Sequence, residues 1–141
     1  MFWLTLVSGG LGHFGLLFAA AMGAEVYAIS HSARKKEDAL QLGAKAFICT
    51  ANEGWNEPWK NTFDFILNTT DATDRFDMAA YFSTLAVNGV FHIVGISDKP
   101  LPTLKTQDMM PGGYSIAASH IGSRPEVLAM LDLASKKNIK R

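Results

Sequence analysis

Apolar residues along this chain gather in six short runs, separated by stretches in which they recur at the spacing of a helix. The runs FDFIL and VFHIVGI are nearly continuous rather than alternating. Continuous apolar character is typical of strands that are buried on both faces of a parallel sheet. The runs predict strands at Phe2–Leu6, Glu25–Ser30, Ala46–Thr50, Phe63–Asn68, Val90–Ile96 and Tyr114–Ser119.

The spacing of apolar residues also predicts four helices between or after these strands. They cover Leu11–Met22, Arg34–Leu42, Thr73–Leu85 and Glu126–Ser135. Gly23 and Gly43 each follow the last turn of a helix, where a left-handed residue commonly ends it. Ser32 suits an N-cap, and Pro125 suits the first turn of the last helix.

The alternation of strands and helices predicts an α/β domain with a doubly wound, mostly parallel six-stranded sheet and helices on both faces. Residues 51–62 contain two tryptophans and predict an irregular or short helical connection. Residues 98–113 are rich in proline, glycine and polar residues, and we expect a loop there. Asn88-Gly89 predicts a turn that leads into the fifth strand.

The 141 residues are enough for one domain with its own core. Only 18% of them are charged, so part of the surface is expected to face a partner domain or a second copy of the chain. A net charge of zero argues against a nucleic-acid surface. The apolar block Leu16–Met22 is too short to span a membrane, and Ser8-Gly9-Gly10 interrupts the first run as no signal peptide would. A single cysteine, Cys49, excludes an internal disulfide and favours a reducing, cytoplasmic location.

A glycine cluster, VSGGLG at residues 7–12, joins the first predicted strand to the first helix. Gly9 would let the backbone approach a pyrophosphate, and Gly12 would let the helix pack closely on the strand, as in the dinucleotide motif G-x-G-x-x-G. Free N–H groups at the start of the helix would face the anion. The motif can be aligned in two registers. If it begins at Val7, its first glycine is missing; if it begins at Gly10, all three glycines are present but the motif lies inside the helix. We prefer the first register because the turn then follows the strand directly; a glycine turn without a ligand is the alternative.

The second predicted strand ends in SHSARKK, residues 30–36, and this stretch bears on the choice of nicotinamide cofactor. An acid at this place would bind the adenosine ribose and repel a phosphate, and a methyltransferase would also need one. Two serines and three cations suit the 2′-phosphate of NADPH through charge-assisted hydrogen bonds. The alternative is a capping serine with a solvated basic turn, but cations at a helix N-terminus oppose the helix dipole.

In these segments the chain resembles the zinc-type medium-chain alcohol dehydrogenases, in particular the NADPH-dependent group that includes the cinnamyl alcohol dehydrogenases. The resemblance rests on VSGGLGHFG, AMGAEVYAISHSARKKEDALQLGA, FDFILNTTDA, NGVFHIVGI and SIAASHIGSRPEVLAMLDLASKKNIK. These segments follow one another in order through nearly the whole chain. The combination of GGLGH, S-x-S-x-x-K and S-x-I-G-S is its most specific part.

The resemblance implies a dinucleotide-binding (Rossmann) domain over residues 1–141, with site residues at the carboxyl ends of its strands. Gly9, Gly10, Leu11 and Gly12 would line the pyrophosphate, and Ser30, Ser32 and Lys35 would contact the adenosine ribose and its 2′-phosphate. Thr69 would lie along the cofactor cleft, and Val94, Gly95, Ser119, His120 and Ile121 would approach the nicotinamide. Val7 stands where the family has glycine, and its Cβ is expected to widen the turn.

The family's chemistry needs a zinc ion that Cys and His ligands hold in a separate catalytic domain. That domain is absent from residues 1–141, and Cys49 with four scattered histidines gives no ligand spacing. The resemblance therefore implies a fragment of an alcohol dehydrogenase or aldehyde reductase that binds NADP(H) without turnover and whose partner is the catalytic domain of the same enzyme. Two alternatives stay open: a free-standing, non-catalytic dinucleotide-binding protein, and a zinc-free quinone oxidoreductase domain.

The last predicted strand, Tyr114–Ser119, is uncharged and is expected at an edge of the sheet. Exposed apolar edge strands invite pairing with another chain. We therefore expect a homodimer through this strand.

Overall fold

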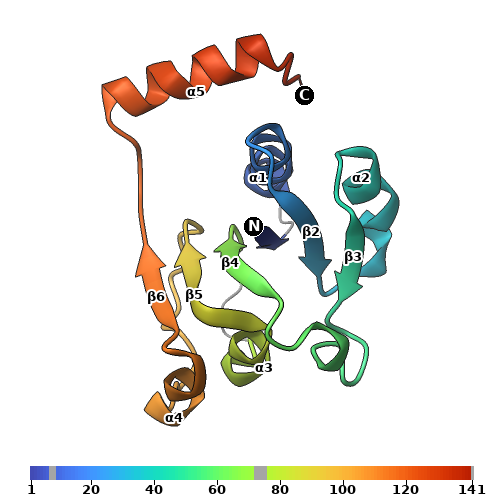
Figure 1. Ribbon diagram of the computed structural model, residues 1–141, viewed down its shortest axis with the longest axis vertical. Coiled ribbons are helices and arrows are strands. Elements are labelled where there is room, and N and C mark those ends of the chain that lie inside the picture. Colours follow the sequence, from blue (N-terminus) through green and yellow to red (C-terminus); the bar gives the residue numbers. More distant parts are fainter. Residues whose placement is uncertain (7–8, 72–75, 141) are drawn as a thin grey trace.

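The computed structural model describes residues 1–6, 9–71 and 76–140, and six strands in these ranges form one parallel sheet (Figure 1). The strands are β1 (Phe2–Leu6), β2 (Glu25–Ser30), β3 (Ala46–Cys49), β4 (Phe63–Asn68), β5 (Leu85–Ile93) and β6 (Ser115–Ala118). Their order across the sheet is β3-β2-β1-β4-β5-β6. The chain builds outward from β1 to β3, returns to pair β4 with β1, and then builds outward to β6. This is the doubly wound arrangement that the sequence predicts.

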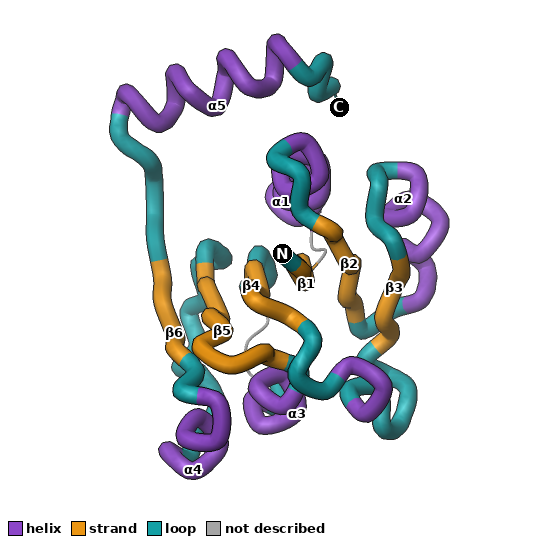
Figure 2. Tube along the Cα trace, in the orientation of Figure 1, coloured by secondary structure: helices purple, strands orange, loops and turns teal. Residues whose placement is uncertain are grey.

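Helices flank this sheet on both faces (Figure 2). The helices of the described residues are α1 (Gly9–Ala21), α2 (Lys36–Gln41), α3 (Met78–Ser83), α4 (Thr106–Met109) and α5 (Arg124–Lys136), of which α5 lies apart from the sheet. Short 3₁₀ turns are η1 (Ala33–Lys35), η2 (Glu57–Trp59) and η4 (Met110–Gly112). Helices that connect strands in opposite directions of winding fall on opposite faces, because each crossover is right-handed. No helix in the described part of the chain has both the length and the apolar character that crossing a bilayer requires.

The face of the sheet beneath α1 and α2, called the α1 face below, has a core of small and medium-sized residues. Leu16 and Ala19 of α1 pack with Val26 and Ala28 of β2, and all four are almost completely buried. Ala39 of α2 joins the same cluster. Small side chains let both helices lie close to the strands, so this half of the sheet is tightly covered.

The opposite face, called the α3 face below, has an aromatic core. Phe63, Phe82 and Phe91 are fully buried there. The ring of Phe82 in α3 lies 6.2 Å from Phe91 and is stacked 6.0 Å from Tyr114. Burial raises the pKa of Tyr81 in the same cluster. Large rings contribute most of the apolar area that this face removes from water.

The connection from β3 to β4 crosses the α3 face, and its two tryptophans hold it there. Trp59 of η2 lies 5.2 Å from the ring of Tyr27, and Trp55 lies 4.9 Å from the ring of Tyr81. The sequence predicts an irregular or short helical connection here, and the structure shows the short helical turn η2 within it.

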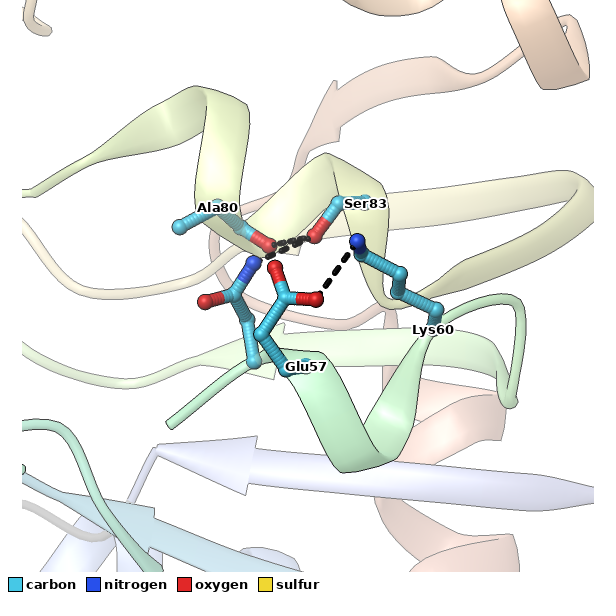
Figure 3. A network of polar contacts seen from close by, with 5 residues as sticks. Glu57, Lys60, Ala80 and Ser83 are labelled. Atoms are coloured by element: carbon cyan, nitrogen blue, oxygen red, sulfur yellow. Dashed lines mark hydrogen bonds and ion pairs between the residues drawn. The ribbon is translucent and has the colours of Figure 1, made fainter. Parts of the chain in front are cut away.

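Polar contacts join the same connection to α3 (Figure 3). The side-chain amide of Asn56 donates to Ser83 Oγ at 2.9 Å, and Ser83 Oγ donates to the carbonyl of Ala80 at 2.7 Å. Lys60 pairs with Glu57 across one turn at 2.7 Å. The exposed ion pair contributes little stability, but the Asn56–Ser83 bond fixes how the connection sits on α3.

Most element bounds agree with the sequence, and the exceptions have local causes. Gly23 and Gly43 have left-handed φ angles of 88° and 97°, as predicted for helix ends. The predicted helix Arg34–Leu42 divides into η1, which Ser32 caps by accepting from the Arg34 N–H, and α2. The predicted helix Thr73–Leu85 is shorter, because Asp77 accepts from the Ala80 N–H and starts α3 at Met78; its first predicted residues, 73–75, lie outside the described residues.

Two sequence predictions about local structure are wrong, and the first concerns the start of β5. This strand begins at Leu85 and runs through Asn88-Gly89, where a turn was predicted, because Leu85 already pairs with Phe63 of β4. Asn88 takes a left-handed φ of 61°, and the register between β4 and β5 shifts between Phe63 and Phe65. Asn88-Gly89 therefore forms an irregularity within the strand instead of a turn before it.

The second concerns segment 98–113, predicted as a loop, which contains α4 and η4. The carboxylate of Asp108 accepts from the Lys105 N–H at 3.3 Å and so caps the first turn of α4. A helix of four residues is too short to give a periodic pattern, so the sequence does not reveal it.

We expect Phe91→Ala to lower the free energy of unfolding by about 3–5 kcal/mol, because it leaves a cavity in the fully buried centre of the α3 face. Val87→Ala in the same strand is the matched control. Val87 is 74% exposed, and we expect its loss to change stability by less than about 0.5 kcal/mol. Urea denaturation followed by circular dichroism measures both. Equal destabilisation by the two variants would contradict the assignment of the core.

Candidate functional site

The carboxyl ends of the strands form the candidate site, centred between β1 and β4. The chain winds in opposite directions from these two strands, so no crossover covers the gap between their carboxyl ends. The predicted site residues all lie along this edge, after β1, β2, β4, β5 and β6. These five neighbouring strands span about 19 Å, at roughly 4.8 Å a strand. The edge thus presents one extended row rather than a compact pocket.

The start of α1 has its backbone open to solvent. Gly9 has a left-handed φ of 56°, and a Cβ at Gly9 or Gly10 would meet nothing within 4 Å. Gly9, Gly10 and Leu11 are exposed, and Gly12 is buried against the sheet. The first turn of α1 holds no acid, so its unpaired N–H groups and the helix dipole favour an anion. Val7 and Ser8, and with them the effect of a Cβ at Val7, lie outside the described residues.

A close approach of α1 to the sheet lies at Gly15, one helical turn beyond Gly12. A Cβ there would lie 3.1 Å from Leu67 and 3.2 Å from Thr5, on β4 and β1. The full-motif register, counted from Gly10, is the one that includes Gly15. The sequence therefore does indicate this contact, through the register that begins at Gly10 and not through the preferred register that begins at Val7.

The end of β2 bears a chain of hydroxyl contacts. The Ser32 N–H donates to Ser30 Oγ at 3.4 Å, and Ser32 Oγ accepts from the Arg34 N–H at 3.4 Å. The Arg34 side chain also donates from Nε to Ser32 Oγ, at 3.3 Å. A hydroxyl that accepts can still donate its own proton. The two serines, Arg34 and the half-buried Lys35 together form a positively charged, donor-rich corner.

Arg34 and His31 are residues of this corner that the predicted site leaves out. Arg34 is held to Ser32, as described above, and His31 Nδ1 lies 3.4 Å from Thr50 Oγ1 after β3. The sequence shows both residues in the SHSARKK stretch, but only the fold shows which groups hold them.

The end of β4 is organised by Asn68, a fully buried polar residue that the sequence reading missed. Its side-chain oxygen accepts from the Thr70 N–H at 3.0 Å. Its backbone carbonyl accepts from Val94 at 2.9 Å and Gly95 at 3.2 Å. Asn68 therefore ties the segments after β4 and β5 together and places Thr69, which is buried, beside Val94 and Gly95.

Gly95 is required by this close packing. A Cβ at Gly95 would overlap the carbonyl oxygen of Thr70 and lie 2.7 Å from its carbonyl carbon. No flexible side chain is involved, so the clash could be relieved only by moving the backbone.

At the β6 end of this edge, a side-chain contact joins β5 to the residue that follows β6. His92 Nε2 lies 2.8 Å from Ser119 Oγ, and the Ser119 N–H donates to the Ile93 carbonyl at 3.1 Å. The His92 ring is stacked on Phe65 of β4, 5.6 Å away. Ser119 is thus oriented by a histidine, whereas His120 and Ile121 are exposed after it. Nothing in the sequence links His92 to Ser119, so their contact is a finding of the fold.

A titratable network lies at the opposite, amino-terminal edge of the sheet. Lys45 and Tyr27 donate to the Glu25 carboxylate, and these bonds hold the pKa of Glu25 below its ordinary value. Burial and the bond to Glu25 raise the pKa of Tyr27, and the Glu25 partner raises the pKa of Lys45. This network joins β2 to the start of β3 and takes no part in the candidate site.

Metal-ligating side chains do not gather anywhere in the described residues. No three His, Cys, Asp or Glu side chains there are placed to hold one ion. The edge is therefore equipped to bind an extended anionic ligand, with an N–H-lined turn in the middle and a basic corner at one end.

Known proteins share the sequence pattern and the fold of this chain. The family model described as zinc-binding dehydrogenase matches residues 10–136. A probable formaldehyde dehydrogenase, AdhA of Bacillus subtilis, is 41% identical over 132 residues, which are 94% of this chain and 37% of that protein.

Two solved structures are similar over nearly the whole chain. A cinnamyl alcohol dehydrogenase from Sorghum bicolor superposes with a TM-score of 0.91 at 31% identity, covering 99% of this chain and 39% of its own. The CAD protein of Helicobacter pylori, solved as a complex with NADP(H), has a TM-score of 0.80 at 31% identity, and the match covers 97% of this chain and 38% of that chain. The chain thus spans less than two fifths of the length of these relatives.

We expect Gly95→Ala to lower the free energy of unfolding by about 1–3 kcal/mol, because the new methyl group would push apart the segments after β4 and β5. Gly10→Ala is the matched control at the same edge, since open space surrounds that position and its φ is not left-handed. We expect this control to be neutral or stabilising by less than about 1 kcal/mol. Guanidinium denaturation measures both, and a Gly95→Ala protein as stable as the control would refute the packing described here.

Proposed function

Because this chain belongs to the zinc-binding dehydrogenase family, we propose that residues 1–141 form the NADP(H)-binding domain of an alcohol dehydrogenase or aldehyde reductase. Bound NADP(H) would supply or accept the hydride that passes between the nicotinamide and an alcohol or aldehyde. The observation that carries the proposal is the basic, hydroxyl-rich corner at the end of β2. The residues of this chain bind and orient the cofactor.

The basic corner suits the adenosine 2′-phosphate. Ser30 and Ser32 are held by backbone and Arg34 donors, so their own protons remain available to a phosphate oxygen. Lys35 would add a charge-assisted bond. Residues 30–36 contain no acid that could repel a phosphate or compete for the cations. The similar Helicobacter pylori enzyme, which was solved as a complex with NADP(H), points the same way.

The start of α1 suits the pyrophosphate. Open space around Gly9 and Gly10 gives the anion access to the backbone, and the N-terminus of α1 provides unpaired N–H groups. Leu11 and Gly12 would line the rest of the pyrophosphate site. Thr69, Val94, Gly95, Ser119, His120 and Ile121 would then lie along the remainder of the edge, toward the nicotinamide.

A catalytic zinc ion does not fit the described residues of this chain, because they bring no ligand set together. We propose that a catalytic domain of the same enzyme holds it, and that residues 1–141 alone bind NADP(H) without turnover. The chain's share of its relatives' length, 37% of the Bacillus subtilis protein, leaves ample room for such a domain. With Cys49 as a free thiol, a reducing, cytoplasmic location suits the protein.

We expect the chain to bind NADPH at least about tenfold more tightly than NADH, because a charge-assisted hydrogen bond contributes roughly 1.5–3 kcal/mol. Lys35→Ala should weaken NADPH binding about tenfold and leave NADH binding unchanged. Lys60→Ala, which removes an exposed cation that follows η2, is the matched control and should change neither. Isothermal titration calorimetry measures all three proteins.

NADH binding as tight as NADPH binding would overturn the proposed selectivity. The same samples should not consume NADPH when an aldehyde is added. Measurable aldehyde reduction by residues 1–141 would overturn the assignment of the chemistry to another domain.

We also propose that two copies of the domain pair through β6, the uncharged edge strand. Its free side offers unpaired backbone groups to a second β6. We expect light scattering to show the mass of a dimer at high protein concentration. A monomer throughout the concentration series would exclude this interface.

A further inference from the structure

One region of the sheet surface has no covering element in the described residues. On the α1 face, Val26 and Ala28 of β2 are buried beneath the helices, as described above. Farther along the same face, over β4 to β6, Phe65, Leu67 and His92 are only half-buried. They share this face because Phe65 and Leu67 pair with Trp3 and Thr5 of β1, and Leu67 pairs with His92.

The winding of the chain explains this gap. α1 and α2 cover the α1 face over β1 and β2, while α3 and the β3–β4 connection both pack on the α3 face. Parallel sheets are normally covered on both faces. The half-buried area over β4 to β6, called the open quadrant below, is therefore an exception within an otherwise covered sheet.

α1 presents an apolar flank to the open quadrant. Phe14, Phe18 and Met22 recur at a spacing of four residues, and Phe14 and Met22 are 40% and 58% exposed. Gly15, which faces β1 and β4, is on the same side of the helix. Ala20, which touches Gly43 beside α2, is on the other side. α1 contains no charged residue, and a helix that is apolar all round is normally enclosed by other elements.

α5 is a second element whose apolar side is exposed in the described part of the chain. Figures 1 and 2 show it apart from the sheet, joined to β6 by an extended segment. Val127, Met130 and Leu131 share one side of it at i, i+3 and i+4, and they are 42%, 42% and 54% exposed. Glu126 caps its first turn by accepting from the Ser123 N–H at 2.6 Å. A cap helps, but a helix of 13 residues is only marginally stable without tertiary packing.

We propose that an apolar helix from outside residues 1–141 fills the open quadrant, packed on β4 to β6, on the flank of α1 and against the apolar side of α5. The relatives provide a source, since a chain 2.5 or more times longer contains this same fold, as the 39% and 37% coverages show. A helix suits this place, because it satisfies its own backbone hydrogen bonds where side chains enclose it. Of the proposed function, this inference uses only the premise that a further domain completes the protein.

Hydrogen exchange with mass spectrometry tests the proposal on the chain itself and on a chimera. The chimera carries residues 1–141 in place of the matched 132 residues of the Bacillus subtilis relative. In the isolated chain we expect the amides of α5 to exchange about as fast as an unpacked helix, at every protein concentration. In the chimera we expect exchange at least about 100-fold slower.

Slow exchange of α5 in the isolated chain would overturn the proposal. If slowing were independent of concentration, α5 would pack on its own sheet, and if it grew with concentration, a second copy would fill the quadrant. Fast exchange in a soluble chimera would also overturn it. Should the chimera not accumulate, the same measurement on the aligned helix of the intact Bacillus subtilis protein decides, with slow exchange supporting the proposal and fast exchange refuting it.

A pair of charge substitutions on α5 gives a second readout. Leu131→Glu places a charge on the apolar side, and Ala129→Glu places the same charge nearly opposite on the helix. We expect Leu131→Glu to lower the Tm of the chimera by several degrees and Ala129→Glu to leave it unchanged, whereas neither alters the Tm of the isolated chain. Equal effects in the chimera, or a loss of Tm from Leu131→Glu in the isolated chain, would overturn the proposal. NADPH titration of the same chimera reads the cofactor site separately.

Discussion

The pairing of β1 with β4 is the constraint on which the rest of this structure depends. It joins two halves of the chain that wind in opposite directions, so the carboxyl ends of these strands meet where no crossover can lie. The same pairing places Asn68 beside Leu6, at the point where the chain leaves β1 for the glycine turn. One backbone ladder therefore sets where the chain leaves β1 toward α1 and where the segments after β4 and β5 begin.

That winding also decides which surfaces the domain leaves uncovered. Right-handed crossovers send α1 and α2 to one face and α3 to the other, and each half of the winding covers its own half of one face. The aromatic connection from β3 to β4 completes the α3 face, but its counterpart on the α1 face is missing in the described residues. The low share of charged residues, 18%, is consistent with a domain that has apolar surface to bury against a neighbour.

The sequence predicts the bounds of a strand well where the strand is buried on both faces of the sheet. It predicts them poorly where pairing with a residue distant in sequence determines where the strand begins. β2 has its predicted bounds because Val26 to Ile29 are buried on both faces, whatever the neighbouring turns do. β5 does not, because pairing with Phe63 outweighs the local turn preference of Asn88-Gly89. The glycine turn and the basic corner are local in sequence and could be found there. The bond between His92 and Ser119 joins residues 27 positions apart, and only the register of β5 against β6 brings them together.

The two anion contacts proposed for the candidate site, at the start of α1 and at the corner after β2, rely on different physical means. α1 contributes only peptide dipoles and unpaired N–H groups, which are fixed in the backbone and carry no mobile charge. The corner after β2 relies on the full charges of Arg34, which is exposed, and Lys35, which is half-buried. Dissolved salt screens exposed charges over about 10 Å at 0.1 M. The proposed preference for NADPH over NADH therefore depends on ionic strength. In concentrated salt the difference between the two affinities becomes smaller, while the contribution of the pyrophosphate contact to binding changes little.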